Sequence, residues 1–332
     1  MKVKIFRFSK KIIIILLCIA LATAAFSYVY TKLSINENDF YAVSESTTNE
    51  PAKKFIKWVN FGVSYTVLKQ AMDYDIKSQA QQVKLNWIEL LSYAACKNGG
   101  KFQEKPSDEI ERLVKRIQNG ETIEEITKDM KHYNYYFEAY SAVLGGFLGD
   151  NNGKYGLQVY SPIAKGFGYS HCSDFGMGRS YGYDRKHLGN DLMGSVGTPI
   201  VAVESGIIEN MGWNKYGGWR IGIRSYDSKR YYYYAHLRKD HPYNNDLKEG
   251  MEVKAGDVIG YLGMTGYSDN ENINGMQKPH LHFGVQLIFD ESQKEGYGEI
   301  WIDVYNIIRL LQSTRSKVVK DTEKKEYYAS NN

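Results

Sequence analysis

The stretch that decides the fold is residues 278–289, KPHLHFGVQLIF. Side chains of a β-strand point alternately to its two faces, so His280 and His282 lie on the same face. Apolar residues fill most of the remaining run, as expected for a buried strand. The sequence therefore predicts a strand that presents two imidazoles to one side of a sheet.

Other short β-like runs precede this strand in the second half of the chain. Turns rich in Gly, Asn and Asp separate them, which is typical of strands in an all-β domain. The runs are PIVAVESGIIENMGW (199–213), WRIGIRSY (219–226), KRYYYYAH (229–236) and DVIGYLG (257–263). They predict a mainly antiparallel β domain within residues 151–312, closed by a helix at residues 301–311.

Four histidines and one aspartate belong to this predicted β domain. His187 and Asp191 are four residues apart, and His236 ends the run 231–235. Together with His280 and His282 they are enough for a catalytic zinc site, which needs three protein ligands and an open position. Spacing alone leaves a second interpretation open, because single histidines are often surface or core residues with satisfied hydrogen bonds.

Four sequence blocks follow one another in the second half of the chain. They are RKHLGNDLMGSVGTPIVAVESG (185–206), YYAHL (233–237), VKAGDVIGYLGMTGYS (253–268) and KPHLHFGV (278–285). In this order they resemble the lysostaphin-type (M23, LytM-like) zinc peptidases, over about residues 165–300. Members of that family cut peptidoglycan peptides, so the resemblance implies a zinc endopeptidase that acts on stem or cross-bridge peptides.

The family pattern implies a role for each of the five residues. His187, Asp191 and His282 would bind one Zn2+ per chain, and His236 and His280 would be catalytic histidines that do not bind it. Zinc would polarise the scissile carbonyl and activate water near neutral pH, while the two free histidines would stabilise the oxyanion.

One segment departs from the family pattern. Residues 267–278, YSDNENINGMQK, replace a brief turn that is usual in the family. Because this segment precedes His280 directly, we expect it to shape one wall of the cleft and to affect substrate preference. The earlier segment His171-Cys172-Ser173-Asp174 could cap the metal or simply line the cleft. Cys96 and Cys172 could pair or stay free.

The region 55–150 has a helical pattern and lies outside the resemblance. Apolar residues recur at helical spacing in 83–97, 107–118 and 133–144, and Thr122 and Glu125 form a capping box. Residues 55–80 are expected to be helical too. We predict a small all-helical domain of unknown role, with a possible protein partner. Polar residues 31–54 would be a linker, and 313–332 a frayed polar tail.

The chain of 332 residues has a formal net charge of +4, which is concentrated in residues 1–11. That flank holds five basic residues and no acid, so the remainder carries −1 and no nucleic-acid partner is expected. Residues 12–30, IIIILLCIALATAAFSYVY, are uncharged and as a helix would span about 28 Å, near the thickness of a bilayer core.

The basic flank predicts a cytoplasmic N-terminus and a single-pass protein of the cell membrane, with the C-terminal part extracytoplasmic. A cleaved signal peptide and a secreted protein are the alternative. The complete prediction is an α+β chain with an N-terminal transmembrane helix, a small all-helical domain and a mainly antiparallel β peptidase domain.

The predicted function is zinc-dependent hydrolysis of peptidoglycan peptides in cell-wall remodelling. The alternative is a catalytically silent LytM-like scaffold, or an activator of other cell-wall hydrolases. Inactive relatives of this family typically lack ligand or catalytic histidines, whereas all five positions are filled here.

Overall fold

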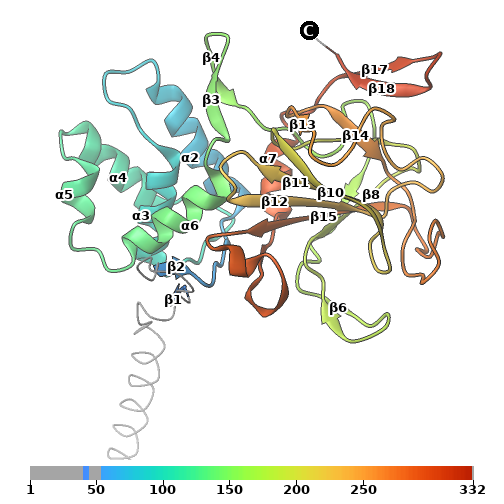
Figure 1. The fold of residues 1–332 in the computed structure, drawn as a ribbon. Coiled ribbons are helices and arrows are strands. Elements are labelled where there is room, and N and C mark those ends of the chain that lie inside the picture. Colours follow the sequence, from blue (N-terminus) through green and yellow to red (C-terminus); the bar gives the residue numbers. More distant parts are fainter. Residues whose placement is uncertain (1–39, 45–53, 331–332) are drawn as a thin grey trace, which may run out of the picture.

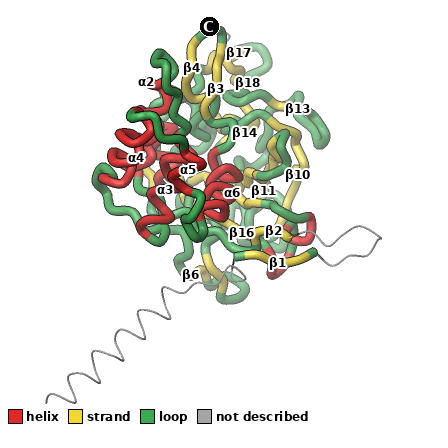
Figure 2. Tube along the Cα trace, turned by 90° about the vertical axis from the view of Figure 1, so that its left-hand side faces the viewer, coloured by secondary structure: helices red, strands yellow, loops and turns green. Residues whose placement is uncertain are grey.

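The computed structural model describes residues 40–44 and 54–330 (Figure 1). Helices gather on one side of the molecule and strands on the other. Figure 2, seen from the helical side, shows helices α2 to α6 clustered beside the strands. Buried apolar side chains of both parts belong to one connected core, which includes Leu90 of the helical part and Phe283 of the β part.

Local sequence signals set the ends of the helices. The carbonyl of the Asn86 side chain accepts the N–H of Ile88 at the start of α3, and Gly99, with a left-handed φ of 61°, ends it. The predicted capping box is confirmed, because Thr122 and Glu125 exchange side-chain to backbone hydrogen bonds at the start of α5. The helices of this part are α2 (Tyr65–Ser78), α3 (Trp87–Asn98), α4 (Asp108–Gln118), α5 (Ile123–Thr127) and α6 (Tyr133–Leu144).

An antiparallel sheet forms the centre of the β part, in the order β13-β10-β11-β12-β15-β8-β5, with β16 paired to β15. The predicted mainly antiparallel β fold is therefore confirmed. Strand β15 lies between β12 and β8, so the histidine-bearing stretch is interior. The strands are β5 (Ser170–His171), β8 (Asn190–Met193), β10 (Gly206–Asn214), β11 (Gly218–Ser225), β12 (Arg230–Ala235), β13 (Glu252–Val253), β15 (His280–Leu287) and β16 (Ile300–Ile302).

Pairs of short strands surround the main sheet. They are β1 (Tyr41–Val43) with β2 (Lys54–Ile56), β3 (Leu148–Asn151) with β4 (Lys154–Leu157), β6 (Gly178–Arg179) with β7 (Arg185–Lys186), β9 (Pro199–Val201) with β14 (Val258–Tyr261), and β17 (Val318–Asp321) with β18 (Glu326–Ala329). The hairpin of β6 and β7 projects from the sheet at the lower right of Figure 1 and directly precedes His187.

Two features hold the helical and β parts together. Helix α7 (Tyr305–Leu311) packs between them, and the side chain of Asn306 donates a hydrogen bond to the carbonyl of Val63. Arg230 of β12 is 1% exposed and donates from Nη1 to the carbonyl of Ala142 on α6, at 2.7 Å. The same guanidinium binds Glu204 and Asp227 of the β part, so one buried cation is hydrogen-bonded on both sides of the boundary.

The structure differs from the expected helix over 55–80. Lys54–Ile56 forms strand β2, which pairs with β1, and α2 begins only at Tyr65. The side chain of Ser64 accepts the N–H of Val67 and starts the helix there. Within the predicted linker 31–54, residues 41–43 thus form β1. Much of that linker lies outside the described residues.

The expected polar tail also differs, because residues 318–329 form the hairpin β17–β18 instead of fraying. Glu326 is fully buried, accepts a hydrogen bond from the hydroxyl of Tyr261, and has its Oε1 at 2.8 Å from Nε2 of His241. Val318 and Tyr327 pack against the apolar cluster of Ala164, Val201 and Val258. Because most residues of this segment are polar, its sequence did not reveal that a few of its side chains contact the core and hold the segment in place.

The predicted location as a single-pass protein of the cell membrane is contradicted. Within residues 40–44 and 54–330 no helix is long and apolar enough to cross a bilayer, and the longest one, α2, has 14 residues. The transmembrane helix was predicted for residues 12–30, which lie outside the described part of the chain.

Candidate metal and catalytic site

Strand pairing brings together residues that are far apart in the sequence. In the antiparallel pair of β15 and β8, His282 lies opposite Asp191. On the other side of β15, His282 lies opposite Ala235, so the next residue, His236, leaves β12 close to both histidines of β15. His187 lies just before β8, in the segment that follows the β6–β7 hairpin.

Three side-chain atoms converge on one place. Nε2 of His187 lies 2.7 Å from Nδ1 of His282 and 3.1 Å from Oδ1 of Asp191, and the last two atoms are 3.4 Å apart. All three side chains are at most 15% exposed. Two imidazole nitrogens and one carboxylate oxygen form a donor set that is typical of catalytic zinc sites.

The environment of Asp191 fits a bound cation. Its Oδ1 is buried and accepts no hydrogen bond from the described residues, which is costly for a charged oxygen. Burial raises the pKa of this carboxyl, but interactions with His187 and His282 hold it well below its usual range, so the group is ionised. A metal ion held by His187, Asp191 and His282 would satisfy the orphaned oxygen.

His236 and His280 lie beside this cluster with their ring centres 4.8 Å apart. Each donates its Nδ1–H to a backbone carbonyl at 2.8 Å, that of Thr265 and that of Lys278, respectively. This fixes the tautomer and leaves Nε2 of each ring as a proton acceptor. Burial, together with His280 and His282, holds the pKa of His236 well below its usual value, so His236 is neutral at neutral pH.

Asp174 and Arg179 extend the site in a way that the sequence did not reveal. Oδ2 of Asp174 lies 3.2 Å, and its carbonyl oxygen 3.0 Å, from Nδ1 of His187. Arg179 donates from Nη2 to Oδ2 of Asp174 at 2.9 Å and to Oδ2 of Asp191 at 3.2 Å. Asp174 thus faces the back of His187 and leaves its Nε2 for a metal.

The pKa of His187 reflects these partners. Burial lowers it, but the nearby carboxylates of Asp174 and Asp191 raise it to about 9. The sequence indicates the segment 171–174, which contains Asp174, as a cap of the metal or a lining of the cleft, and it indicates no role for Arg179. The structure places the carboxylate of Asp174 against Nδ1 of His187, whereas Nε2 of that ring faces the cluster.

A cleft of about 160 Å³ opens above the cluster. All five residues singled out in the sequence line it, and so do Tyr267 and Met276 of the long segment 267–278, as expected for a cleft wall. A neighbouring groove of about 470 Å³ shares Leu188, Tyr233 and His282 with the cleft and is lined by residues of β10, β11, β12 and β15. An extended chain could therefore enter the cleft from the side.

Other residues considered from the sequence supply no side-chain atom to the group of His187, Asp191 and His282. His171 packs its ring against that of Tyr305 at 4.4 Å, and burial lowers its pKa to about 4. Cys96 and Cys172 are both free thiols. The run Tyr231–Tyr234 is mostly core, with Tyr232 and Tyr234 almost fully buried, while Tyr233 reaches the cleft.

Known proteins share both the sequence around this site and the fold. Residues 185–294, about a third of the chain, match the model of a family described as peptidase family M23. An L-Ala–D-Glu endopeptidase of Bacillus subtilis is 39% identical over 117 residues, which are 35% of this chain and 34% of that protein. The peptidoglycan DD-endopeptidase ShyC of Vibrio cholerae is 33% identical over 148 residues, 41% of this chain and 30% of that protein. The chain thus spans about a third of the length of these relatives.

A solved structure extends the likeness to the helical part. A candidate glycyl-glycine endopeptidase, lytM, from Ruminococcus gnavus has a TM-score of 0.54 and 24% identity. The match covers 83% of this chain and 96% of that one, so the two share a fold beyond the segment 185–294.

Proposed function

Residues 185–294 form a domain of peptidase family M23, and from this premise we propose that the chain is a zinc-dependent endopeptidase that hydrolyses peptide bonds of peptidoglycan. The observation that carries the proposal is the convergence of His187, Asp191 and His282 in a cleft that also contains two further histidines. The names of two relatives, which cut L-Ala–D-Glu or peptidoglycan, support the substrate. Because peptidoglycan lies outside the cytoplasm, the domain would act there.

The proposed chemistry divides the site into two sets of residues. His187, Asp191 and His282 would hold the zinc, which supplies a Lewis acid when bound. His236 and His280 each present a free Nε2 beside it, because their Nδ1–H groups are bound to backbone carbonyls. They can accept a proton from the attacking water and return one to the leaving amine. In the protonated form they also stabilise the oxyanion.

Asp174 and Arg179 would prepare the ligands. The backbone carbonyl of Asp174 accepts the Nδ1–H of His187, and its carboxylate lies 3.2 Å from the same nitrogen, so Asp174 orients the imidazole, which is a common arrangement behind histidines that bind zinc. Arg179 binds the second oxygen of Asp191 and so leaves Oδ1 directed at the metal.

The alternative function is a silent scaffold or an activator of other cell-wall hydrolases. It predicts a site that lacks one or more of the metal-binding or catalytic side chains. All five side chains are instead present within one cleft, with both non-ligand histidines in a tautomer suited to proton transfer. We therefore favour the enzyme.

A single preparation tests the proposal. The purified full-length protein is analysed for bound zinc and incubated with purified peptidoglycan, and the fragments are identified by mass spectrometry. We expect one zinc per chain and new peptide termini, which would also identify the bond. The absence of both stoichiometric zinc and cleavage would reject the enzyme, and zinc without cleavage, alongside stimulation of another hydrolase, would favour the activator.

A further inference from the structure

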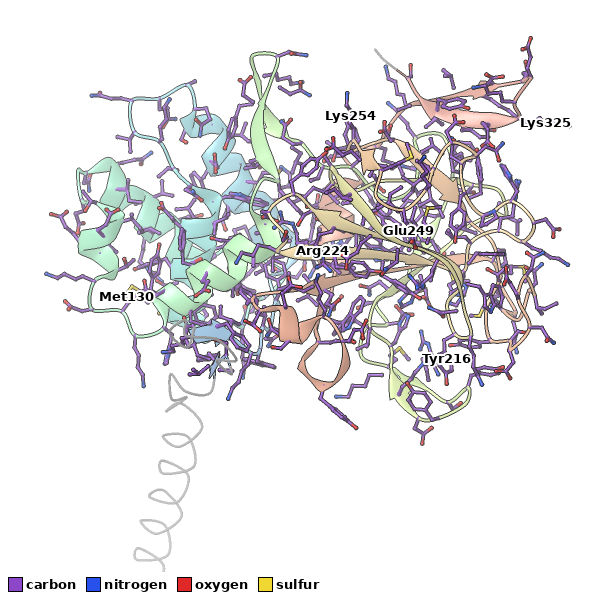
Figure 3. All side chains as sticks on the ribbon, in the orientation of Figure 1. Met130, Tyr216, Arg224, Glu249, Lys254 and Lys325 are labelled. Carbon is purple, nitrogen blue, oxygen red and sulfur yellow. The ribbon has the colours of Figure 1, made fainter. Side chains whose placement is uncertain are left out.

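Arg185 stands at the rim of the cleft inside a cage of tyrosines. Its Cζ lies 4.6 Å from the ring centre of Tyr216, 5.3 Å from that of Tyr267 and 5.8 Å from that of Tyr183. Tyr181 completes the cage by stacking on Tyr267, with ring centres 4.6 Å apart and planes 3° from parallel. Figure 3 labels Tyr216, whose side chain lies beside the hairpin that carries β6.

The guanidinium has donors that no described residue uses. Nη1 donates to the carbonyl of Tyr181 and Nη2 to the hydroxyl of Tyr267. A guanidinium carries five N–H donors, so three remain, and no carboxylate in the described ranges pairs with Arg185. Stacked rings restrict the orientation of the planar fork, so that its free edge is ready for a ligand.

Among the cationic side chains around the cleft, Arg185 is the best placed to bind an anionic ligand. Arg179 is engaged by Asp174 and Asp191, and Lys186 is exposed on a flexible stem. Asp191 is the one acidic side chain among the described residues that line the cleft, and it belongs to the candidate metal cluster. The rim of the cleft is therefore positively charged, and Arg185, whose orientation the tyrosine rings restrict, forms no ion pair with a described carboxylate.

Tyr267 lies between Arg185 at the rim and the proposed catalytic histidine His236. Its ring contacts Arg185 on one side and lies 6.0 Å from the ring of His236 on another. One aromatic ring thus separates the guanidinium from a proposed catalytic histidine. Because an extended peptide advances about 3.3–3.6 Å per residue, a ligand at Arg185 belongs to a residue close to the scissile bond.

We propose that Arg185, held by Tyr183, Tyr216 and Tyr267, binds a free carboxylate of the substrate peptide within about three residues of the bond that is cut. The inference rests on the proposed endopeptidase function and narrows its substrate to peptides with an acidic residue at that position. A D-glutamate in a peptide chain has such a carboxylate, because only one of its two carboxyl groups forms the chain. Glycine bridges have none, so Arg185 would discriminate against them.

The test compares two synthetic peptides of the L-Ala-D-Glu-L-Lys type that differ at one group, the free carboxylate of D-Glu or its carboxamide. For the wild-type protein we expect kcat/KM to be about 10- to 100-fold higher for the acid, since hydrogen bonds to charged groups contribute about 1.5–3 kcal/mol. In Arg185→Gln that ratio should fall toward one, and in Arg185→Lys it should be intermediate, because the charge stays but the fork is lost.

The matched control is Arg238→Gln. Arg238 also lies over a tyrosine ring, at 5.0 Å from Tyr261, but it does not line the cleft, so the wild-type ratio should be retained. A purely structural role of Arg185, pinning Tyr181 to Tyr267, predicts an equal loss for both peptides. An unchanged ratio in Arg185→Gln, or a ratio near one in the wild type, would overturn the proposal.

A binding measurement separates this inference from the proposed function. Dissociation constants of both peptides are measured in a His280→Ala background, with and without Arg185→Gln. A preference for the acid that depends on Arg185, together with no cleavage of either peptide by the wild-type protein, would support the carboxylate subsite and reject the endopeptidase. Equal binding of both peptides would reject the subsite whether or not cleavage occurs.

Discussion

Nε2 of His187 and Nδ1 of His282 lie 2.7 Å apart, although 95 residues separate them in the chain. The two histidines thus present different nitrogens to the same point. Asp174 occupies Nδ1 of His187, which leaves Nε2. His282 is turned by its strand, and its Nε2 edge faces Gly189, where an added Cβ would meet Nε2 at 2.8 Å. The geometry of the candidate metal site therefore depends on Asp174 and Gly189, which lie against the ring nitrogens that do not face the cluster.

Gly189→Ala should weaken zinc binding without changing any ligand. The added Cβ would lie 2.6 Å from the carbonyl oxygen of Phe283 and 2.8 Å from Cε1 of His282, so strand or ring must shift. We expect lower zinc occupancy, measured by metal analysis after dialysis. Gly168→Ala is the control, because a Cβ there meets nothing within 4 Å. Full occupancy in Gly189→Ala would show that the ring is not held from this side.

His282→Ala and His280→Ala should separate metal binding from catalysis. His282 supplies one of the three converging atoms, whereas Nε2 of His280 lies 3.8 Å from the nearest oxygen of Asp191. We expect His282→Ala to lose zinc, and His280→Ala to keep zinc but lose about 10²- to 10⁴-fold in turnover, as when a general acid–base is removed. Loss of zinc in His280→Ala, by metal analysis, would reverse the proposed roles.

Asp174→Asn should reduce the affinity for zinc about 10- to 100-fold, because partners behind a histidine ligand set its orientation and basicity. Asp174 also accepts the backbone N–H of Asp191 and pairs with Arg179, so its charge holds two ligands in place. Competition with a chromophoric chelator measures the affinity. Asp246→Asn, an exposed carboxylate elsewhere in the β part, should leave it unchanged, and equal affinities for both variants would argue against this role of Asp174.

Arg230→Met should lower the free energy of unfolding by about 3–5 kcal/mol, which is typical when one partner of a buried ion pair is removed. It leaves the carboxylate of Glu204 with only the hydroxyl of Tyr232 as a donor, and the carbonyl of Ala142, across the boundary of the helical and β parts, without the donor that Arg230 supplies. Urea denaturation followed by circular dichroism measures the change. The exposed Arg112→Met on α4 should change stability by less than about 0.5 kcal/mol. A similarly small effect of Arg230→Met would mean that the two parts are held together by apolar packing alone.

Much of the fold could be predicted because its signals are local. The alternation in 280–287 and the cap at Thr122 each specify structure within a few residues. The helix expected over 55–80 was wrong for its first ten residues, and the frayed tail expected over 313–332 was wrong for residues 318–329, for the opposite reason. Strand β2 forms because β1 pairs with it. The hairpin β17–β18 is held in place because Glu326 accepts a hydrogen bond from Tyr261, which is distant in the sequence.

The sequence by itself determined which residues could form a metal site, since His187, Asp191, His236, His280 and His282 stand in blocks whose order resembles one family. Only the tertiary structure decided that Asp174 and Arg179 support the candidate metal ligands. It also decided that Arg185 lies among tyrosine rings and forms no ion pair with a described carboxylate. The physical reason is distance. Hydrogen bonds and charge pairs act over a few ångströms, and only the folded chain brings Asp174 and His282 to His187, and Tyr267 to Arg185, within that range.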